Sequence, residues 1–223
     1  MSLPHLSEST EMYLKAMAEL GDGEAVAIGR LAQRLDITPV SANEMVKRLG
    51  DQGLVSHTPY KGVNLTKKGR KAASNVVRRQ RLWECFLHDH LKMEWSQLYD
   101  LACSLEHATA PEVTQALADF LGNPKTCPHG NPIPAADGSF EPLIGIRLSE
   151  VSVGSTVRVL AVRATAADVL GYLQEHNILP GRVMTLLEVA PMEGPLTVEV
   201  EGNRVALGLL LSKLVIVEMK SFS

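Results

Sequence analysis

Three side chains that could bind a metal ion follow one another within one predicted helical turn. In the segment "YDLACSLEH", Cys103, Glu106 and His107 stand at positions i, i+3 and i+4, and this spacing places side chains on one face of a helix. A thiolate, a carboxylate and an imidazole would then offer sulfur, oxygen and nitrogen donors to one metal ion. The alternative is a half-buried thiol beside an exposed Glu–His pair, which spacing alone does not exclude.

A second pair of donors lies in a Pro-rich segment. In "TCPHGNPIP", Cys127 and His129 flank Pro128, whose ring restricts the backbone, so that both side chains can point to one side. The alternative is an ordinary free thiol and a surface histidine. The cysteines, with Cys85 the first of three, are separated by 18 and 24 residues, which is not the compact spacing of an iron–sulfur cluster motif. Three cysteines also make no disulfide framework, so we expect a reducing compartment.

Basic residues are concentrated in one part of the chain. Residues 1–80 carry twelve Lys and Arg against eight Asp and Glu, whereas residues 81–223 carry ten against seventeen. From Lys47 to Arg81 there are ten cations and a single acid, Asp51. A basic block within an acidic chain indicates a local polyanionic partner. The alternative is a solvated helix face.

The pattern over residues 5–75 predicts three short helices and a hairpin. Helices are expected over 9–20, with Ser9 or Thr10 as N-cap, over 28–35, and from Pro39 to about Gly53. Thr38 is a natural N-cap for the third helix, since proline fits the first helical position. The apolar residues of that helix are expected to form its buried stripe, namely Val40, Met45, Val46 and Leu49. The segment "LVSHTPYKGVNLT" then alternates and turns at Lys61-Gly62, which predicts a two-stranded wing.

A helix-turn-helix followed by a wing is typical of DNA-binding domains, in which the second helix of the motif enters the major groove. Ser41 and Asn43 could reach phosphates, and Glu44 could accept a hydrogen bond from cytosine N4. The residues predicted to lie against DNA are Thr38, Pro39, Ser41, Asn43, Glu44, Lys47, Arg48 and Lys61, with Lys67 and Lys68 placed for further phosphate contacts. The alternative is a winged helix that contacts another protein.

The remainder of the chain predicts an α+β multidomain protein. Residues 66–121 are patterned as helices, and residues 122–150 form a loop and linker with five prolines. Residues 150–220 alternate with the period of β-strands around one helix, as in an SH3-like barrel. No apolar run approaches the roughly 18 residues of a membrane span, and the N-terminus has no secretory pattern. We therefore expect a soluble, cytoplasmic protein.

Five motifs, in order, resemble the diphtheria-toxin-repressor family of metal-dependent transcriptional regulators. The segment "STEMYLKAM" resembles the first helix of that family, and "TPVSANEMVKRLGDQGLV" resembles its recognition helix. "ACSLEH" resembles its metal-binding helix, and "CPHGNPIP" the loop that closes its dimerisation domain. The segment from "NILPGRV" to "LVIVEM" resembles its C-terminal SH3-like domain, a type shared with ferrous-transport accessory proteins. The resemblance covers nearly the whole chain.

This resemblance implies a domain organisation and a function. The implied domains are a winged helix-turn-helix over 1–70, a helical metal-binding and dimerisation domain over 71–130, a linker over 131–150 and an SH3-like domain over 151–223. The implied protein is a homodimer that binds a palindromic operator in double-stranded DNA and represses metal-homeostasis genes. It would not be an enzyme, and it would have neither a membrane partner nor a small-molecule substrate.

The resemblance also implies two metal sites per chain. The implied primary site consists of Met12, Cys103, Glu106 and His107, and the implied secondary site of Glu84, Cys127, His129 and Asp168. The iron-responding branch has histidines where this chain has Gln80 and Tyr99, and C-terminal ligands where it has Ala166 and Val169. Soft Cys and Met donors favour Fe(II), whereas the secondary site resembles that of manganese-responding members. The expected cofactor is thus Fe(II) or Mn(II).

Two other classes of protein compete with this interpretation. A winged-helix regulator could sense a different metal or an organic ligand. A metalloenzyme would need an open coordination position with a nearby acid or base. The sequence contains no H-E-x-x-H or comparable catalytic signature, and an enzyme would leave the basic wing unexplained.

Overall fold

The structure is a computed structural model that describes residues 6–21, 24–58, 61–139 and 141–220. The chain divides into two compact units. The first unit comprises Met1–Arg79 with Pro134–Phe140, and the second comprises Gln80–Ile133 with Glu141–Ser223. Each unit is described by itself below.

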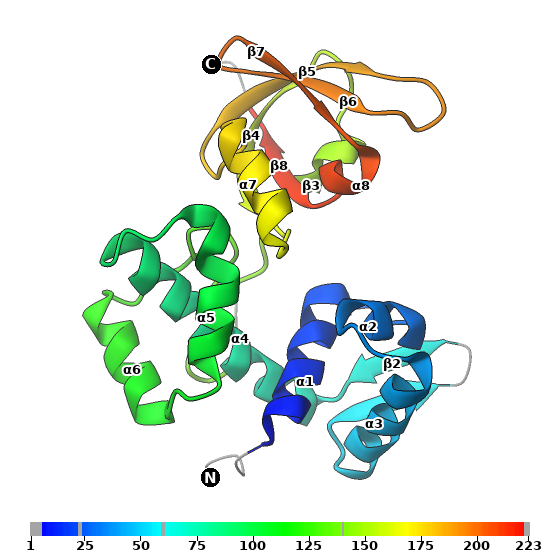
Figure 1. Cartoon of the computed structure of the whole chain (residues 1–223), viewed down its shortest axis with the longest axis vertical. Coiled ribbons are helices and arrows are strands. Elements are labelled where there is room, and N and C mark those ends of the chain that lie inside the picture. The colour runs from blue at the N-terminus through cyan, green and yellow to red at the C-terminus, as the bar shows by residue number, and fades with distance from the viewer. Residues whose placement is uncertain (1–5, 22–23, 59–60, 140, 221–223) are drawn as a thin grey trace. The chain divides into compact units, whose positions relative to one another are not determined.

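The first unit contains the predicted winged helix-turn-helix (Figure 1). Its elements are α1 (Glu8–Gly21), α2 (Ile28–Arg34), α3 (Pro39–Asp51), β1 (Val55–Thr58), β2 (Gly62–Leu65) and the start of α4 (Lys67–Asp89). The strands β1 and β2 pair antiparallel and form the wing, and Val26 adds a short bridge to Val63. The wing prediction is thereby confirmed, although residues 59 and 60 of its turn lie outside the described residues.

The helix starts follow from local hydrogen bonds. Thr38 Oγ1 accepts a hydrogen bond from the backbone N–H of Ser41 at 3.1 Å, and Pro39 occupies the first position of α3. The predicted start of α3 is therefore confirmed. The helix predicted over 9–20 is present as α1, but the prediction of Ser9 or Thr10 as its N-cap is wrong. The helix begins at Glu8, and Ser7 Oγ accepts a hydrogen bond from the N–H of Thr10 at 3.3 Å.

The expected buried stripe of α3 needs one correction. Val46 and Leu49 are fully buried and Met45 is half-buried, but Val40 is 70% exposed. Nine residues separate Val40 from Leu49, which is about two and a half turns of an α-helix. These two side chains therefore point to opposite sides of α3, and only Leu49 faces the core.

The second unit combines helices with a single antiparallel sheet. Its helical elements are the rest of α4, the 3-10 turn η1 (Trp95–Gln97), α5 (Leu98–Glu106) and α6 (Pro111–Phe120). The elements that follow are β3 (Ile146–Arg147), the 3-10 turn η2 (Leu148–Glu150), β4 (Thr156–Val162), α7 (Ala167–Glu175), β5 (Val183–Val189), β6 (Leu196–Val200), β7 (Asn203–Leu207), α8 (Leu209–Ser212) and β8 (Val215–Met219).

The six strands of the second unit lie in the order β3-β8-β4-β5-β6-β7. Burial alternates along β4, β5 and β6, as in β4 at Val157, Val159 and Ala161, because one face of the sheet covers the core. That core also includes Trp95 and Leu98 from the helical part of the unit. The predicted α+β organisation is confirmed. Among the described residues, no helix combines the length and apolar character needed to cross a membrane.

Candidate metal centres

The first cluster of potential ligands occupies the C-terminal turn of α5. Cys103, Glu106 and His107 place one sulfur, one oxygen and one nitrogen donor atom within 4.8 Å of one another. The Glu106 side chain is fully buried, whereas Cys103 and His107 are partly exposed. Nδ1 of His107 lies 3.6 Å from Oε1 of Glu106, which exceeds the usual hydrogen-bond distance. The convergence predicted from the i, i+3, i+4 spacing is therefore present.

The donor set of this first cluster fits a divalent cation. A carboxylate as buried as that of Glu106 is stable only beside hydrogen-bond donors or positive charge. A metal ion held also by the sulfur of Cys103 and the imidazole of His107 would supply that charge. Because Cys103 and His107 are partly exposed, an ion could reach this cluster from solvent.

The second cluster joins a helix to a loop. Glu84 lies on α4, and Cys127 and His129 lie on the loop that follows α6. The donor atoms of these three side chains also lie within 4.8 Å of one another. Each residue is at most 5% exposed, so this cluster is more deeply buried than the first. The structure thus brings together three of the four residues predicted for the secondary site.

Hydrogen bonds and charge keep the second cluster in place. Oε2 of Glu84 lies 3.2 Å from Nδ1 of His129, and Gln80 Nε2 donates to Oε1 of Glu84 at 3.1 Å. Burial acts to raise the pKa of Glu84, but His129, with help from Cys127 and Arg81, outweighs burial and lowers it. Burial, followed by the negative charge of Glu84, raises the pKa of Cys127 well above its usual value. Without a cation the Cys127 thiol therefore keeps its proton, which a bound metal would displace.

Trp95 determines which nitrogen of His129 faces the cluster. Nε2 of His129 lies 3.1 Å from the carbonyl oxygen of Trp95. A carbonyl oxygen only accepts, so Nε2 carries a hydrogen and donates it, and Nδ1 is left to face Glu84. The indole of Trp95 packs against the His129 ring at a centroid distance of 4.5 Å, and its Nε1 donates to the carbonyl of Pro128 at 3.0 Å. Trp95 thus holds the loop at two successive residues.

The same loop is hydrogen-bonded to strand β4. The N–H of Val162 donates to the carbonyl of His129 at 2.8 Å, and Asn131 Nδ2 donates to the carbonyl of Val162 at 2.8 Å. Between them, Gly130 has a φ of +81°, and a Cβ at this position would lie 2.0 Å from the carbonyl oxygen of Leu160. Only glycine fits such an approach. The second cluster is thereby attached directly to the sheet.

Two predicted ligands lie outside these clusters. Asp168 is exposed at the start of α7, where its Oδ1 accepts a hydrogen bond from the N–H of Val169, and it is not among the grouped donors. Met12 lies on α1 of the first unit and lines a groove of about 330 Å³ with neighbours that include Tyr13 and Leu35. The roles of Asp168 and Met12 as ligands stay predictions.

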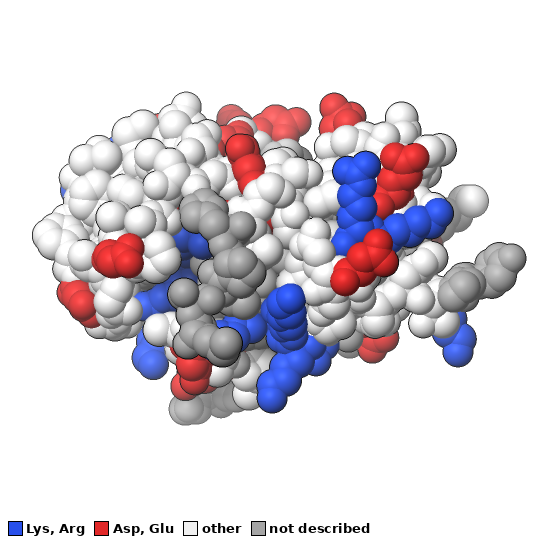
Figure 2. All heavy atoms as spheres, turned by 90° about the horizontal axis from the view of Figure 1, so that it is seen from below, with Lys and Arg blue, Asp and Glu red and all other residues white. Residues whose placement is uncertain are grey.

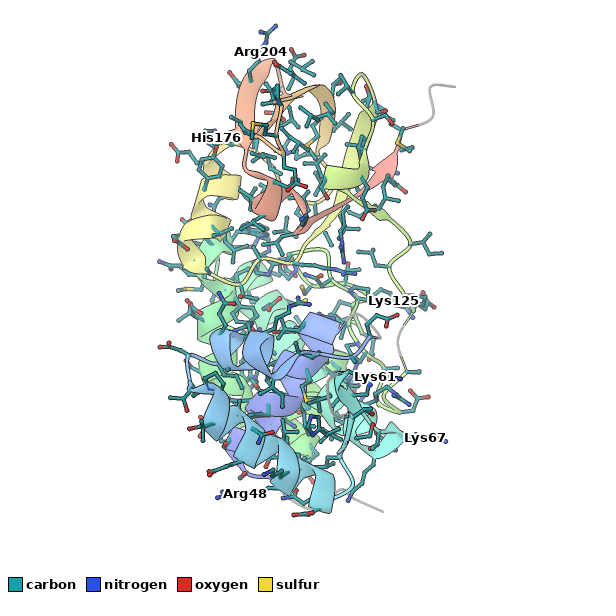
Figure 3. The ribbon with its side chains drawn as sticks, turned by 90° about the vertical axis from the view of Figure 1, so that its right-hand side faces the viewer. Arg48, Lys61, Lys67, Lys125, His176 and Arg204 are labelled. Atoms are coloured by element: carbon teal, nitrogen blue, oxygen red, sulfur yellow. The ribbon has the colours of Figure 1, made fainter. Side chains whose placement is uncertain are left out.

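Most residues predicted to contact DNA lie on the exposed side of the first unit. Thr38, Pro39, Ser41, Glu44, Lys47, Arg48 and Lys61 are exposed, whereas Asn43 is half-buried. Figure 2 views the molecule from below and shows Lys and Arg on that side together with scattered Asp and Glu. Figure 3 labels Arg48, Lys61 and Lys67, whose side chains extend from α3, from beside the wing and from the start of α4.

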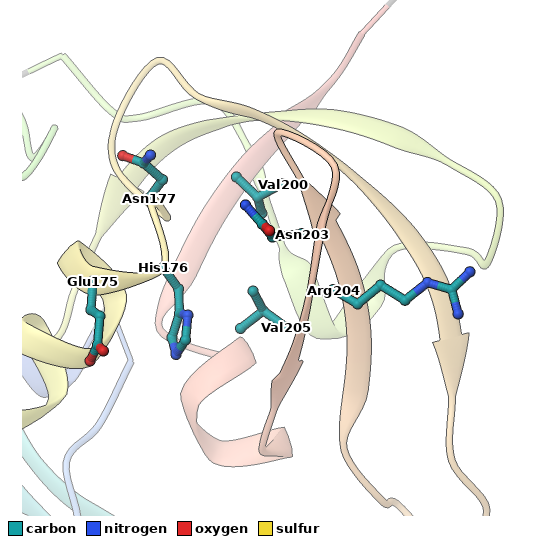
Figure 4. Close-up of a pocket in the computed structure, with 7 residues that line it drawn as sticks. All are labelled: Glu175, His176, Asn177, Val200, Asn203, Arg204 and Val205. Atoms are coloured by element: carbon teal, nitrogen blue, oxygen red, sulfur yellow. The ribbon is translucent and has the colours of Figure 1, made fainter.

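A further cavity of about 340 Å³ lies in the second unit, between the end of α7 and the β6–β7 hairpin (Figure 4). Its walls include Glu175, His176 and Asn203, while the guanidinium of Arg204 points away from His176. Within the described ranges, groups of three or more His, Cys, Asp or Glu donors occur only at the two clusters above. This cavity therefore adds no third group of metal ligands.

Sequence analysis missed two residues that position the second cluster. Trp95 contacts His129 across the fold, and no local spacing links these two residues. Gln80, by contrast, precedes Glu84 by four residues on α4, and this i, i+4 spacing is a signal that could have found it. Gln80 was noted only as a departure from a family pattern. The single signal for Trp95 is that it is one of two tryptophans in a chain poor in aromatic residues.

Three family models match successive parts of the chain. Residues 5–63 match the model described as "Iron dependent repressor, N-terminal DNA binding domain". Residues 66–135 match "Iron dependent repressor, metal binding and dimerisation domain", and residues 146–219 match "FeoA domain". Both donor clusters fall within the second of these matches.

Individual relatives extend the likeness over most of the chain. The iron-dependent repressor IdeR of Mycobacterium tuberculosis is 31% identical over 214 residues, which are 89% of this chain and 91% of the relative. The diphtheria toxin repressor of Corynebacterium efficiens is 31% identical over 212 residues, 91% of each chain. A solved manganese-dependent transcriptional repressor in complex with manganese has a TM-score of 0.86 at 30% identity, covering 95% of this chain and all of that one. The manganese regulator SloR has a TM-score of 0.80 at 28% identity, covering 96% and 98%.

Proposed function

Because the chain belongs to the iron-dependent repressor family, we propose that it is a homodimeric DNA-binding transcriptional repressor activated by Fe(II) or Mn(II). The observation that carries this function is the convergence of Cys103, Glu106 and His107 at the end of α5. A set of sulfur, oxygen and nitrogen donors in a domain of this family is best explained by a divalent cation. The protein would act in the cytoplasm by binding DNA, not by catalysing a reaction.

The primary site is proposed to consist of Met12, Cys103, Glu106 and His107. The three α5 residues are supported by their geometry, whereas Met12 is supported by the family resemblance of the first helix. A divalent cation supplies positive charge that several donors share. Ligands drawn from two separate helices, α1 and α5, would give the ion a different affinity for different conformations of the chain, which is what a switch needs.

The secondary site is proposed to consist of Glu84, Cys127 and His129, with Asp168 as a fourth ligand. Nδ1 of His129 and the carboxylate of Glu84 already face each other. The hydrogen bonds from β4 to the loop would link occupancy of this site to the C-terminal domain. The proposed domains remain 1–70, 71–130, 131–150 and 151–223, in keeping with the successive family matches.

A second copy of the chain is the proposed partner of the helical domain. Val76 and Leu82 on α4 are already buried within the chain. Phe120 and Val113 on α6 remain 63% and 48% exposed, and the Phe120 ring lies 6.0 Å from that of Phe86 on α4. This aromatic and aliphatic surface is suited to a symmetric interface, and a twofold dimer would bind a palindromic operator.

The ligand types of the two proposed sites are compatible with both Fe(II) and Mn(II). The IdeR relative is named for iron, whereas the solved repressor with a TM-score of 0.86 is named for manganese. Selectivity in such sites depends on geometry and metal availability as well as on ligand type. We propose that both ions activate DNA binding in vitro.

An anaerobic DNA-binding titration tests this function. The full-length protein would be titrated onto operator DNA selected in vitro, at buffered free concentrations of Fe(II), Mn(II) and Zn(II). We expect tight, sequence-specific binding with Fe(II) or Mn(II) and its loss on adding a chelator. Equal affinity with and without chelator would contradict metal activation, and equal affinity for operator and random DNA would contradict specific repression.

A further inference from the structure

The loop of the second cluster continues directly into the first unit. Pro134–Phe140 belongs to the first unit, although the chain before and after this segment belongs to the second. The segment begins five residues after His129. Helix α4 crosses the same boundary, between Arg79 and Gln80. The loop and α4 are therefore the two places where a link between the cluster and the winged helix-turn-helix could be built.

The ligands of the loop share a short hairpin with the residues that lead to this segment. The N–H of Cys127 donates to the carbonyl of Asn131 at 3.0 Å, and the N–H of Ile133 donates to the carbonyl of Lys125 at 2.8 Å. These two hydrogen bonds join the two sides of the hairpin. A restriction placed on Cys127 is therefore transmitted to Ile133, the residue before Pro134.

Two arginines of α4 hold the same stretch of chain by its backbone. Arg81 donates to the carbonyl of Pro132, and Arg78 Nη1 donates to the carbonyl of Pro134 at 2.8 Å. Arg78 is only 8% exposed, and its hydrogen bond to Pro134 is buried. A buried guanidinium is stable only when its N–H groups have acceptors. The Pro134 carbonyl is therefore fixed relative to α4.

The residues after Pro134 form a compact turn against the start of α4. The N–H of Ala135 donates to the carbonyl of Ser139 at 2.6 Å, and the N–H of Gly138 donates to the carbonyl of Ala135 at 2.9 Å. A Cβ at Gly138 would lie 3.4 Å from Cγ of Lys71. The two alanines that follow Lys71 are buried in the core of the winged helix-turn-helix. The turn thus lies on the part of α4 that belongs to this core.

We propose that Arg78 is a positioning residue that couples metal binding at the second cluster to the DNA affinity of the winged helix-turn-helix. This inference rests on the proposed metal-activated function. A metal ion bound at the second cluster restricts the loop, so less conformational entropy is lost when Arg78 holds Pro134. Occupancy therefore stabilises the form of the first unit in which the turn lies on α4. The coupling is reciprocal, because this form in turn favours metal binding.

A double-mutant cycle on the full-length protein tests the coupling. Arg78→Met removes the hydrogen-bond donors and keeps an apolar side chain in the buried position. DNA binding is measured against buffered free Mn(II) for wild type, Arg78→Met, Cys127→Ala/His129→Ala and the triple variant. We expect Arg78→Met to need about tenfold more free Mn(II) than wild type. The triple variant should need no more than Cys127→Ala/His129→Ala, because both changes break the same link.

Two further measurements separate coupling from a general loss of stability. Elemental analysis at saturating Mn(II) should find two metal ions per chain in Arg78→Met, as in wild type. Arg78→Gln is a second variant, polar but with a shorter side chain, and should shift the Mn(II) midpoint in the same direction. Arg182→Met is the control, because Arg182 donates to Glu201 on the sheet and not to the loop. It should keep the wild-type midpoint.

The outcomes separate this inference from the proposed function. Activation of Arg78→Met and Arg78→Gln at the wild-type Mn(II) concentration would overturn the inference. A triple variant that needs about 100-fold more Mn(II) than wild type, the product of two independent effects, would also overturn it, and so would a single metal ion per chain in Arg78→Met. In these cases a metal-activated wild type leaves the proposed function standing. If Mn(II) does not activate the wild type, the proposed function fails and the inference fails with it.

Discussion

The two donor clusters of the second unit are built in different ways. Cys103, Glu106 and His107 come from one helical turn of α5. Glu84 and His129 are 45 residues apart and meet only because the loop after α6 packs against α4 and β4. A helix is sufficient to assemble the first cluster, whereas the second requires the folded domain. Local spacing in the sequence is therefore enough to specify the first cluster, whereas tertiary contacts specify the second.

The clusters also differ in burial and in hydrogen bonding. All three residues of the second cluster are at most 5% exposed, and Gln80 and Trp95 hold two of them. In the first cluster Cys103 and His107 remain partly exposed. Metal exchange should therefore be faster at the first cluster, which suits sensing. The second cluster is better suited to a stable structural link with the sheet.

Loss of a ligand from the first cluster should have the largest effect. His107→Ala should raise the free Mn(II) needed for DNA binding by about 100-fold or more, since even residues that only orient ligands contribute roughly 10- to 100-fold. The measurement is a DNA-binding curve against buffered Mn(II). The control His88→Ala, at a partly exposed histidine of α4 outside both clusters, should behave as wild type. Activation of His107→Ala at the wild-type metal concentration would show that sensing occurs elsewhere.

Removing the loop ligands should have a smaller effect. The double variant Cys127→Ala/His129→Ala should bind one metal per chain instead of two and require roughly tenfold more free metal, within the usual range of coupling between sites. Elemental analysis and the same DNA-binding curve measure both quantities. His176→Ala, which changes a histidine in the cavity of the sheet domain, is the control. If the double variant keeps wild-type stoichiometry and midpoint, the loop has only a structural role.

The three thiols should report the difference in burial directly. Burial, with the charges of Glu84 and Asp89, raises the pKa of Cys85 to about 12. Burial also raises the pKa of Cys127 well above its usual value. Few thiolates form at these two residues near pH 8, so Cys103 should alkylate at least about tenfold faster in the metal-free protein. Mn(II) should then slow the reaction of Cys103. Peptide mass spectrometry after timed iodoacetamide exposure gives the three rates, and equal rates in folded protein would refute the comparison.

The smallest effect should come from Trp95. Trp95→Phe removes the hydrogen bond from Nε1 to the Pro128 carbonyl, which is worth about 1 kcal/mol, or roughly fivefold in affinity. Competition with a chelator should show this loss at the second cluster alone. Trp83→Phe is the matched control, because Trp83 Nε1 donates to Thr109 Oγ1 and not to the loop. A similar loss in both variants would indicate general destabilisation.

Features that depend on residues close together in the sequence were predictable, whereas features that depend on residues far apart in the sequence were not. The start of α3 at Thr38 and the convergence on α5 depend on residues within one turn, and both were predicted correctly. Glu84 entered only through family resemblance, because nothing near it in sequence indicates Cys127. Trp95 acts through a contact across the fold and leaves no local pattern, whereas Gln80 stands at i, i+4 to Glu84 on α4, a spacing that the sequence does contain.

The one error within α3 has a different cause. Val40 was assigned to the buried stripe because it is apolar, although its position along the helix places it opposite Leu49. That prediction relied on the apolar character of the residue and did not take into account its angular position around the helix. Asp168, by contrast, was proposed from resemblance alone, and the structure leaves it outside the donor cluster.

The close approach of Gly130 to Leu160 has a consequence for how this protein can evolve. A single methyl group at position 130 would collide with the backbone of β4, and it would displace His129 and Asn131 at the same time. Ligands can be exchanged one by one and so tune the preference for one metal over another. Position 130 allows no such gradual change, because even the smallest substitution there would detach the loop of the second cluster from β4 in one step.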